Sequence, residues 1–321
     1  MNTKPLAMRD VFLDNIWQTM SRDDKIFFVC ADFGSPVLDR IRRDFPERFI
    51  NVGIAEQSLI NVTAGLAIEG FKVFAYAIAP FITMRCYEQI RVSLALLSEV
   101  RPVNVSLIGV GAGYSYVVSG PTHQCYEDIT LMRALPTFQI LSPSDHATAG
   151  AMFDTCYSNM GLKYLRFDAQ VLPQLYDSDS IDTKDGFFVH GNGKDIAMVA
   201  TGYMVHTALA AADKMKTDGI DVTVIDLFDL SRFSASALKD VLAEFSAMMS
   251  LEEGFVGCGG MDAMLRNLLA QSGLNIAYEA IGIRPGYSFE LGNRTELHAD
   301  LGMDVDSVVQ RAMSLHAGAA G

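Results

Sequence analysis

The stretch NVGIAEQSLINVTAGLAIEG, Asn51 to Gly70, decides how the rest of the chain is interpreted. It opens as a polar, glycine-containing loop and continues with apolar residues typical of a buried helix that ends at Gly70. One carboxylate, Glu56, stands where this helix begins. It can complement the positive end of the helix dipole, or it can share a proton with a nitrogen atom of a ligand. The residues alone leave both roles open.

Short apolar runs alternate with helical patterns on both sides of this stretch. Strands are expected at 25–32, 71–81, 102–113, 137–145 and 163–168, and helices at 55–70, 83–100, 122–135 and 145–159. This alternation predicts a mostly parallel sheet that is covered by helices. In such sheets ligands bind at the carboxyl ends of the strands. The loops that contain Asp32, Glu56, Phe81 and His123 are therefore the places to look for a site.

A polar, acidic segment rich in turn-forming residues separates this unit from a second one. We assign residues 1–175 to the first domain, 176–192 to a linker and 193–321 to the second domain. The second domain repeats the alternation of strands and helices on a smaller scale. The expected fold class is therefore α/β, with a parallel-sheet domain followed by a smaller α/β domain.

Composition narrows the range of partners. The formal net charge of −13 and the pI near 4.8 argue against a nucleic-acid surface, which needs a basic patch, and weakly against an anionic membrane. No apolar run reaches the length of a transmembrane helix, and the N-terminus lacks the apolar core of a signal peptide. Five scattered cysteines without a CxxC pair indicate a reducing, cytoplasmic compartment. Small molecules or another protein are the expected partners.

The common catalytic and cofactor motifs are absent from their required contexts. GVGAGY (109–114) is not followed by a helix, and the sequence contains no P-loop, HExxH or GxSxG motif. Without paired histidines at ligand spacing, no metal bound by this chain is expected. Among the six histidines only His123 lies in a Gly/Pro loop after a core strand. It is a candidate for function, although a lone histidine is more often structural.

Three segments together resemble a known family. They are FINVGIAEQSLINVTAGLA (49–67), APFITMRCYEQIR (79–91) and SGPTHQCYEDITLMRALPTFQILSPSD (119–145). Their order and spacing are similar to the thiamine-diphosphate enzymes of the transketolase and deoxyxylulose-phosphate synthase group. The resemblance extends over residues 10–315 and corresponds to the C-terminal half of those enzymes. It implies a pyrimidine-binding domain followed by a transketolase C-terminal domain.

The resemblance implies a role for each candidate residue. Glu56 matches the glutamate that meets N1′ of the aminopyrimidine and thereby activates the thiazolium carbon, and His123 matches the histidine that bonds the donor oxygen. Phe81 matches the aromatic residue that stacks on the pyrimidine, and Ile78 takes the place of a second aromatic residue. Asp32 matches an acidic residue near the cofactor at the boundary between subunits. A core aromatic residue and a solvated loop carboxylate remain the alternatives for Phe81 and Asp32.

One part of the family's machinery has no counterpart in this sequence. The diphosphate and its Mg²⁺ or Ca²⁺ are held in the family by a GDG motif with a later asparagine, and GNGKD (191–195) and GCGGMD (257–262) lie in the wrong contexts. The resemblance therefore implies one subunit of a split transketolase. A second chain is expected to supply the diphosphate and metal site, and the active site is expected to form between the two chains in an α2β2 assembly.

Several departures from the family bear on the substrate. Gly111 and Ala169 stand where sugar-phosphate transketolases have a phosphate-binding histidine and arginine, and Ser119 stands where they have an aspartate that reads an acceptor hydroxyl. Losing such contacts weakens the binding of a phosphate group. An acceptor other than an ordinary sugar phosphate is therefore the expectation, namely a non-phosphorylated or otherwise modified aldehyde, and the same can hold for the donor. The pocket is expected to be shaped by Gly111, Tyr114, Tyr116 and Ser119.

Ketol transfer to an aldehyde acceptor is the favoured function. The alternatives are a pyruvate-decarboxylating synthase, the β-subunit of a 2-oxo acid dehydrogenase, which the GPTHQ form disfavours, and a non-catalytic scaffold, which intact Glu56 and His123 disfavour. Other polar residues are expected to pack, to form interfaces or to lie at the surface and at strand ends. They are Arg85, Tyr87 and Gln89 in the first domain, and His206, Asp226, Glu252 and Glu253 in the second.

Overall fold

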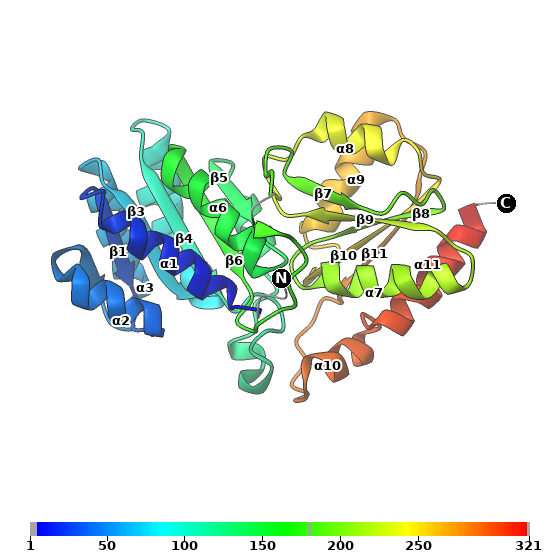
Figure 1. Ribbon diagram of the computed structural model, residues 1–321, viewed down its shortest axis with the longest axis horizontal. Helices are drawn as coiled ribbons and strands as arrows, with labels where there is room; N and C mark the ends of the chain where they lie inside the picture. Colours follow the sequence, from blue (N-terminus) through cyan, green and yellow to red (C-terminus); the bar gives the residue numbers. More distant parts are fainter. Residues whose placement is uncertain (1–4, 179–180, 320–321) are drawn as a thin grey trace.

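The computed structural model consists of two α/β units that lie side by side (Figure 1). It describes residues 5–178 and 181–319. The first unit contains a six-stranded sheet in the order β2-β1-β3-β4-β6-β5, and every neighbouring pair in it is parallel. The second unit contains a five-stranded sheet in the order β11-β10-β8-β9-β7, in which β7 runs antiparallel to β9. The predicted fold class is confirmed.

The strands of the first unit are β1 (Ile26–Cys30), β2 (Phe49–Asn51), β3 (Lys72–Ile78), β4 (Asn104–Val110), β5 (Phe138–Leu141) and β6 (Gly161–Phe167). Its α-helices are α1 (Met8–Met20), α2 (Pro36–Asp44), α3 (Glu56–Ile68), α4 (Tyr87–Gln89), α5 (Asp128–Arg133) and α6 (His146–Ser158). Short α4 lies between two π-helical segments, η2 (Phe81–Arg85) and η3 (Ile90–Leu96). The 3-10 segments are η1 (Pro46–Arg48) and η4 (Val117–Thr122).

Helices cover both faces of this sheet, as expected for a parallel sheet whose strands are apolar on both sides. Helices α1 and α6 pack on one face, where the Phe12 ring makes edge-on contacts with Phe74, Phe153 and Phe167 at 5.3–6.1 Å between centroids. Helix α3 and the segment from η2 to η3 cover the other face through a cluster of buried apolar side chains. The loops at the carboxyl ends of the strands remain at one edge.

The strands of the second unit are β7 (Phe187–His190), β8 (Ile196–Ala200), β9 (Val222–Leu227), β10 (Ala247–Phe255) and β11 (Ala277–Ile283). Its helices are α7 (Met204–Thr217), α8 (Ala235–Leu242), α9 (Met261–Ser272), α10 (Arg294–Leu301) and α11 (Val305–Ala319). Helices α7 and α11 cover one face of this sheet, and α8 and α9 cover the other (Figure 1). Within the described ranges no helix is long and apolar enough to cross a membrane.

Strand β7 lies inside the segment that the sequence analysis assigned to the linker. It pairs with β9 from Phe187↔Leu227 to His190↔Val224, and Phe187 is buried. Gly186 and Gly191, both with positive φ, turn the chain at its two ends. Residues 187–190 of the predicted linker thus belong to the second sheet, because a four-residue edge strand in a polar context leaves little periodic signal. Residues 179–180 of that linker lie outside the described residues.

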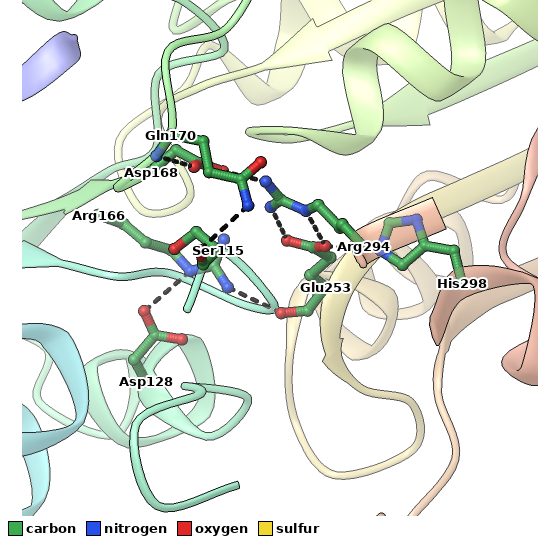
Figure 2. A network of polar contacts seen from close by, with 8 residues as sticks. All are labelled: Ser115, Asp128, Arg166, Asp168, Gln170, Glu253, Arg294 and His298. Atoms are coloured by element: carbon green, nitrogen blue, oxygen red, sulfur yellow. Dashed lines mark hydrogen bonds and ion pairs between the residues drawn. The ribbon is translucent and has the colours of Figure 1, made fainter. Parts of the chain in front are cut away.

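A buried ionic network joins the two units (Figure 2). Arg166 Nε donates to Asp128 at 2.8 Å, and Arg166 Nη2 donates to the backbone oxygen of Glu253 at 2.7 Å. Arg294 from the second unit donates to Asp168 at 2.6 Å and to both carboxylate oxygens of Glu253. Because these side chains are almost fully buried and mutually paired, they fix the two units against each other.

Three acidic residues of the second unit, which we expected at the surface or at strand ends, are instead buried. Glu252, Glu253 and Asp226 are all buried. Burial raises the pKa of Glu252 and of Asp226 to about 7. Burial acts to raise the pKa of Glu253 too, but Arg294 and a bond from His298 hold that pKa well below its usual range. His206, the fourth residue of that set, is partly buried and bonds the Ser144 backbone oxygen.

Candidate active site

The loop before α3 is fixed by one asparagine at the carboxyl edge of the sheet. Asn51 Oδ1 accepts hydrogen bonds from the backbone N–H groups of Asp32 at 3.1 Å and of Gly53 at 2.9 Å. This ties the loop after β1 to the loop after β2. Glu56 then begins α3, whose N-terminus has no side-chain cap, so its carboxylate complements the helix dipole.

Glu56 is buried and is paired with an arginine that the sequence analysis assigned to packing. Arg85 Nη1 lies 3.1 Å from Glu56 Oε1 and 3.2 Å from Oε2. The exposed fractions of the two side chains differ, at 5% for Glu56 and 47% for Arg85. The pair lines a cleft together with Ile54, Gln57 and neighbouring loop residues. The carboxylate thus faces an opening rather than the protein interior.

Phe81 continues this arrangement. The Arg85 guanidinium carbon lies 3.8 Å from the centroid of the half-buried Phe81 ring. Both residues belong to the π-helical segment η2, which starts directly after the loop that follows β3. A π-helix has more residues per turn than an α-helix, so side chains four residues apart point in different relative directions. Such turns are frequent at functional sites.

His123 also contacts Phe81. The two rings make an edge-on contact with 5.2 Å between centroids. His123 Nδ1 is 2.9 Å from the Thr122 hydroxyl, and the His123 backbone N–H donates to the Gly120 carbonyl at 3.0 Å. Nε2 makes no hydrogen bond with any described residue, so it is the ring nitrogen that is available to a ligand. Glu56, Arg85, Phe81 and His123 thus form one continuous row, which we call the edge row.

Ile78, at the end of β3, and Asp32, in the loop after β1, lie near the edge row, and the structure describes no hydrogen bond between either of them and a side chain of the row. Ile78 is the last residue of β3 and is partly exposed, three residues before Phe81. Asp32 is exposed, has a φ of 46°, and accepts a hydrogen bond from Asn51 Nδ2 at 3.2 Å. A positive φ in a residue other than glycine is uncommon and is often found at functional positions.

The four residues predicted to shape the substrate pocket divide into two groups. Gly111 has a φ of 107°, and a Cβ atom at this position would overlap the ring of Tyr116. Tyr116 therefore fills the space that a side chain at residue 111 would take. Ser119 is exposed in the loop before His123. Tyr114, in contrast, is buried against Tyr126 and His298 between the two units, so it lines no opening.

Arg9, near the start of α1, is a further residue at this edge that the sequence analysis missed. Burial raises the pKa of Tyr76 and of Tyr116, and the positive charge of Arg9 opposes both rises. The Tyr76 hydroxyl is buried without a hydrogen-bond partner that the structure describes. No local sequence motif identifies Arg9, because it comes close to Tyr76 and Tyr116 only when α1 packs on the sheet.

The residues of the edge row fit the pyrimidine part of thiamine diphosphate. A planar cationic group, the Arg85 guanidinium, already lies against both the Phe81 face and the Glu56 carboxylate. An aminopyrimidine makes the same demands on its surroundings, namely an aromatic face and a carboxylate in its plane. Within the described residues, no group of three or more His, Cys, Asp or Glu side chains is arranged to hold a metal ion.

Comparison with known proteins gives a consistent result. Residues 4–174 match the transketolase pyrimidine binding domain, and residues 188–308 match the transketolase C-terminal domain. A subunit of the apulose-4-phosphate transketolase of Actinobacillus succinogenes is 32% identical over 85% of this chain and 86% of its own length. A subunit of 6-deoxy-6-sulfo-D-fructose transketolase from Clostridium sp. (strain MSTE9) is 26% identical, covering 95% of this chain and 93% of its own.

Longer relatives and solved structures agree with this result. The 1-deoxy-D-xylulose-5-phosphate synthase of Trichormus variabilis is 26% identical over 98% of this chain but only 49% of its own length. A solved structure titled as a split gene transketolase, an inactive beta4 tetramer, superposes with a TM-score of 0.85 at 28% identity, covering 98% of this chain and 99% of that one. This chain therefore belongs to the transketolase family and contains its pyrimidine-binding and C-terminal domains.

Proposed function

We propose that this chain is the C-terminal subunit of a split transketolase, which transfers a two-carbon ketol unit from a ketose donor to an aldehyde acceptor. The edge row carries the proposal, because it combines a buried carboxylate, an aromatic face and a histidine at an open edge of the sheet. The full-length match to relatives named as transketolase subunits supports it.

Three residues of the edge row, Glu56, Phe81 and His123, have roles that their geometry supports. When bound, thiamine diphosphate supplies a nucleophilic carbon that also accepts the electrons of the breaking bond. Glu56 would bond N1′ of the pyrimidine, and Phe81 would stack on the ring, with Ile78 and Asp32 beside it. His123 would present Nε2 to the oxygen of the donor, since its Nδ1 is already engaged by Thr122.

The proposal requires a partner chain. The edge row offers a site for the pyrimidine, whereas the sequence lacks the family's motif for the diphosphate and its Mg²⁺ or Ca²⁺. We propose that a second chain brings both to the open edge and completes the site in an α2β2 assembly. The solved relative that is titled an inactive beta4 tetramer is consistent with a chain that lacks activity alone. The five free cysteines fit a cytoplasmic location.

The substrate end of the pocket has both neutral and cationic features. Tyr116 over Gly111, with Ser119 nearby, presents hydroxyl groups, which fit the non-phosphorylated acceptor expected from the sequence. Arg9, which is paired with Asp10 at 2.9 Å, is the cation whose charge reaches Tyr116 at this edge. The two relatives named above act on a ketose phosphate and a sulfonated ketose according to their names. We therefore propose that the donor carries a terminal anion, while the acceptor needs none.

Co-expression with the chain that carries the diphosphate half-site would test this function. The purified complex is expected to transfer a ketol unit from a ketose to an aldehyde without releasing carbon dioxide. Release of carbon dioxide from pyruvate would instead support the synthase alternative. Glu56→Gln is expected to lower turnover by at least about 100-fold, because the proton partner of the pyrimidine is lost. Glu88→Gln, which changes an exposed carboxylate on α4 and leaves Glu56 intact, is the control.

A further inference from the structure

A single side chain of this protein contacts both elements of the proposed pyrimidine site. The Arg85 guanidinium donates from Nη1 to both oxygens of Glu56, at 3.1 and 3.2 Å. Its carbon lies 3.8 Å from the Phe81 ring centroid. The group is planar, positively charged and rich in N–H donors, and it stacks on an aromatic ring as readily as it bonds a carboxylate. These are also the properties of a pyrimidine that shares a proton with Glu56.

We propose that, in the chain without its cofactor, the Arg85 guanidinium occupies the place of the aminopyrimidine, and that it must leave when thiamine diphosphate binds. This inference rests on the proposed function. It makes Arg85 a positioning residue, because it holds the Glu56 carboxylate at the edge of the sheet until the partner chain delivers the cofactor. Two groups cannot share the Phe81 face and the Glu56 oxygens at once, so arginine and cofactor compete for one site.

The Arg85 side chain is exposed enough to move while the backbone around it stays in place. Its side chain is 47% exposed, so it can rotate toward solvent, whereas the Glu56 side chain is enclosed at 5%. The backbone at Arg85 stays fixed, since its carbonyl accepts from Gln57 Nε2 at 3.4 Å and the adjacent Cys86 thiol donates to the Ile82 carbonyl at 2.9 Å. The motion is therefore a change of rotamer and not a rearrangement of the helix.

If the Arg85–Glu56 pair only stabilised the fold, both side chains would be expected to be buried. An arginine that serves only stability is usually enclosed with its partner, as Arg166 is with Asp128 in the seam between the units. Exposed arginine–carboxylate pairs contribute little to stability. Arg85 is therefore expected to affect ligand binding more than stability. If its side chain occupies the pyrimidine place about nine-tenths of the time, the apparent affinity for a pyrimidine ligand falls about tenfold.

The isolated chain can be tested with a fragment of the cofactor. The probe is 4-amino-5-hydroxymethyl-2-methylpyrimidine, titrated by calorimetry and followed by the NMR signals of the chain. Arg85→Ala is expected to bind this probe about tenfold more tightly than the wild type, and Arg85→Lys to an intermediate extent. Methylguanidinium is expected to compete with the probe more strongly in Arg85→Ala than in the wild type, because it refills the vacated place.

The matched control is Arg91→Ala, which removes an arginine of similar exposure from the same helical segment. It should bind the probe like the wild type. Thermal unfolding establishes that each variant is folded, and Arg85→Lys serves if Arg85→Ala does not fold. Equal probe affinity in Arg85→Lys, Arg85→Ala and the wild type would overturn the inference.

The complex with the partner chain separates this inference from the proposed function. In ¹⁵N spectra of the guanidinium groups, the Arg85 Nε signal is expected to move to a solvent-exposed value when thiamine diphosphate and Mg²⁺ are added. Tight cofactor binding with an unchanged Arg85 signal would overturn the inference and leave the function intact. A folded complex that fails to bind thiamine diphosphate would overturn the function, and the inference with it.

Discussion

Two arginine–glutamate pairs in this molecule have the same chemistry and opposite consequences. At the edge of the first sheet, Arg85 is 47% exposed and faces Glu56 across a cleft. In the seam between the units, the Arg294 and Glu253 side chains are only 4% and 2% exposed (Figure 2). The seam arginine also bonds Asp168, so none of its charge is left for a ligand. Exposure, and not residue type, distinguishes the pair that a ligand can replace from the pair that fixes the fold.

Removal of the seam arginine is expected to have the largest effect on stability. Arg294→Ala would leave Glu253 and Asp168 as buried carboxylates without their cation, which is expected to cost about 3–5 kcal/mol of unfolding free energy. Thermal and denaturant unfolding would measure the loss. A cost below about 1 kcal/mol would show that the seam tolerates an unpaired charge and that its burial is less complete than the structure indicates.

A second test of the seam region uses pH. Asp226 Oδ2 accepts from Ser144 at 2.5 Å and from Tyr176 at 2.7 Å, with the Asp145 carboxylate close by, and burial raises the pKa of Asp226 to about 7 from 3.8. The folded chain therefore keeps a proton that the unfolded chain releases. The stabilising contribution is complete below about pH 4 and is lost as the pH rises through 7.

Asp226→Asn is expected to remove this loss, which contributes a slope of up to about 1.4 kcal/mol per pH unit, and to leave the similar loss that comes from Glu252. Unfolding free energies measured from about pH 4 to 8 would show it, with the exposed Asp240→Asn as control. Glu253 works in the opposite direction, because its lowered pKa stabilises the fold above about pH 4.5 and that contribution is lost toward acid. Identical slopes in Asp226→Asn and the wild type would contradict the assignment.

Gly111, at the edge of the first sheet, is expected to be as sensitive to substitution as the buried seam is. Alanine there would have to adopt a φ of 107° and displace the Tyr116 ring, at an expected cost of about 1–3 kcal/mol. Gly65→Ala in α3, where nothing lies near the added carbon, should be neutral or stabilising. If Gly111→Ala is as stable as Gly65→Ala, Tyr116 does not fill this space in solution.

The smallest expected effect on stability belongs to the edge pair itself. Arg85→Ala is expected to change the unfolding free energy by less than about 1 kcal/mol, because Arg85 is half exposed and its removal opens the cleft that Glu56 lines, so that water can solvate the carboxylate. The same thermal melts that are used for Arg294→Ala provide the measurement, with Arg91→Ala as reference. A loss as large as that of Arg294→Ala would remove the distinction between the two pairs.

The sequence predicts the edge row only in part. Glu56, Phe81 and His123 could be expected to converge, because they follow strands of one parallel sheet and such strands end at a common edge. Arg85 is expected from the sequence to pack or to form an interface, on a helix over 83–100. The structure is π-helical over Phe81–Arg85, and Arg85 there pairs with Glu56.

The seam could not be predicted for a different reason. Glu252 and Glu253 are adjacent acidic residues at a strand end, a pattern typical of a solvated surface. Their burial depends on partners that are distant in the sequence, since Arg294 lies 41 residues after Glu253. Tyr114 was placed in the pocket by its position in the loop, but packing against Tyr126 turns it toward the second unit. Local patterns carry no information on such long-range pairs.

The most direct test of the central claim is a calorimetric titration of thiamine diphosphate and Mg²⁺ into three samples: this chain, its partner chain, and their mixture. We expect weak binding by this chain alone and tight binding by the mixture, because the edge row supplies the pyrimidine site and the partner supplies the diphosphate and metal site. Tight binding by this chain alone would contradict the claim that its site is half of a whole.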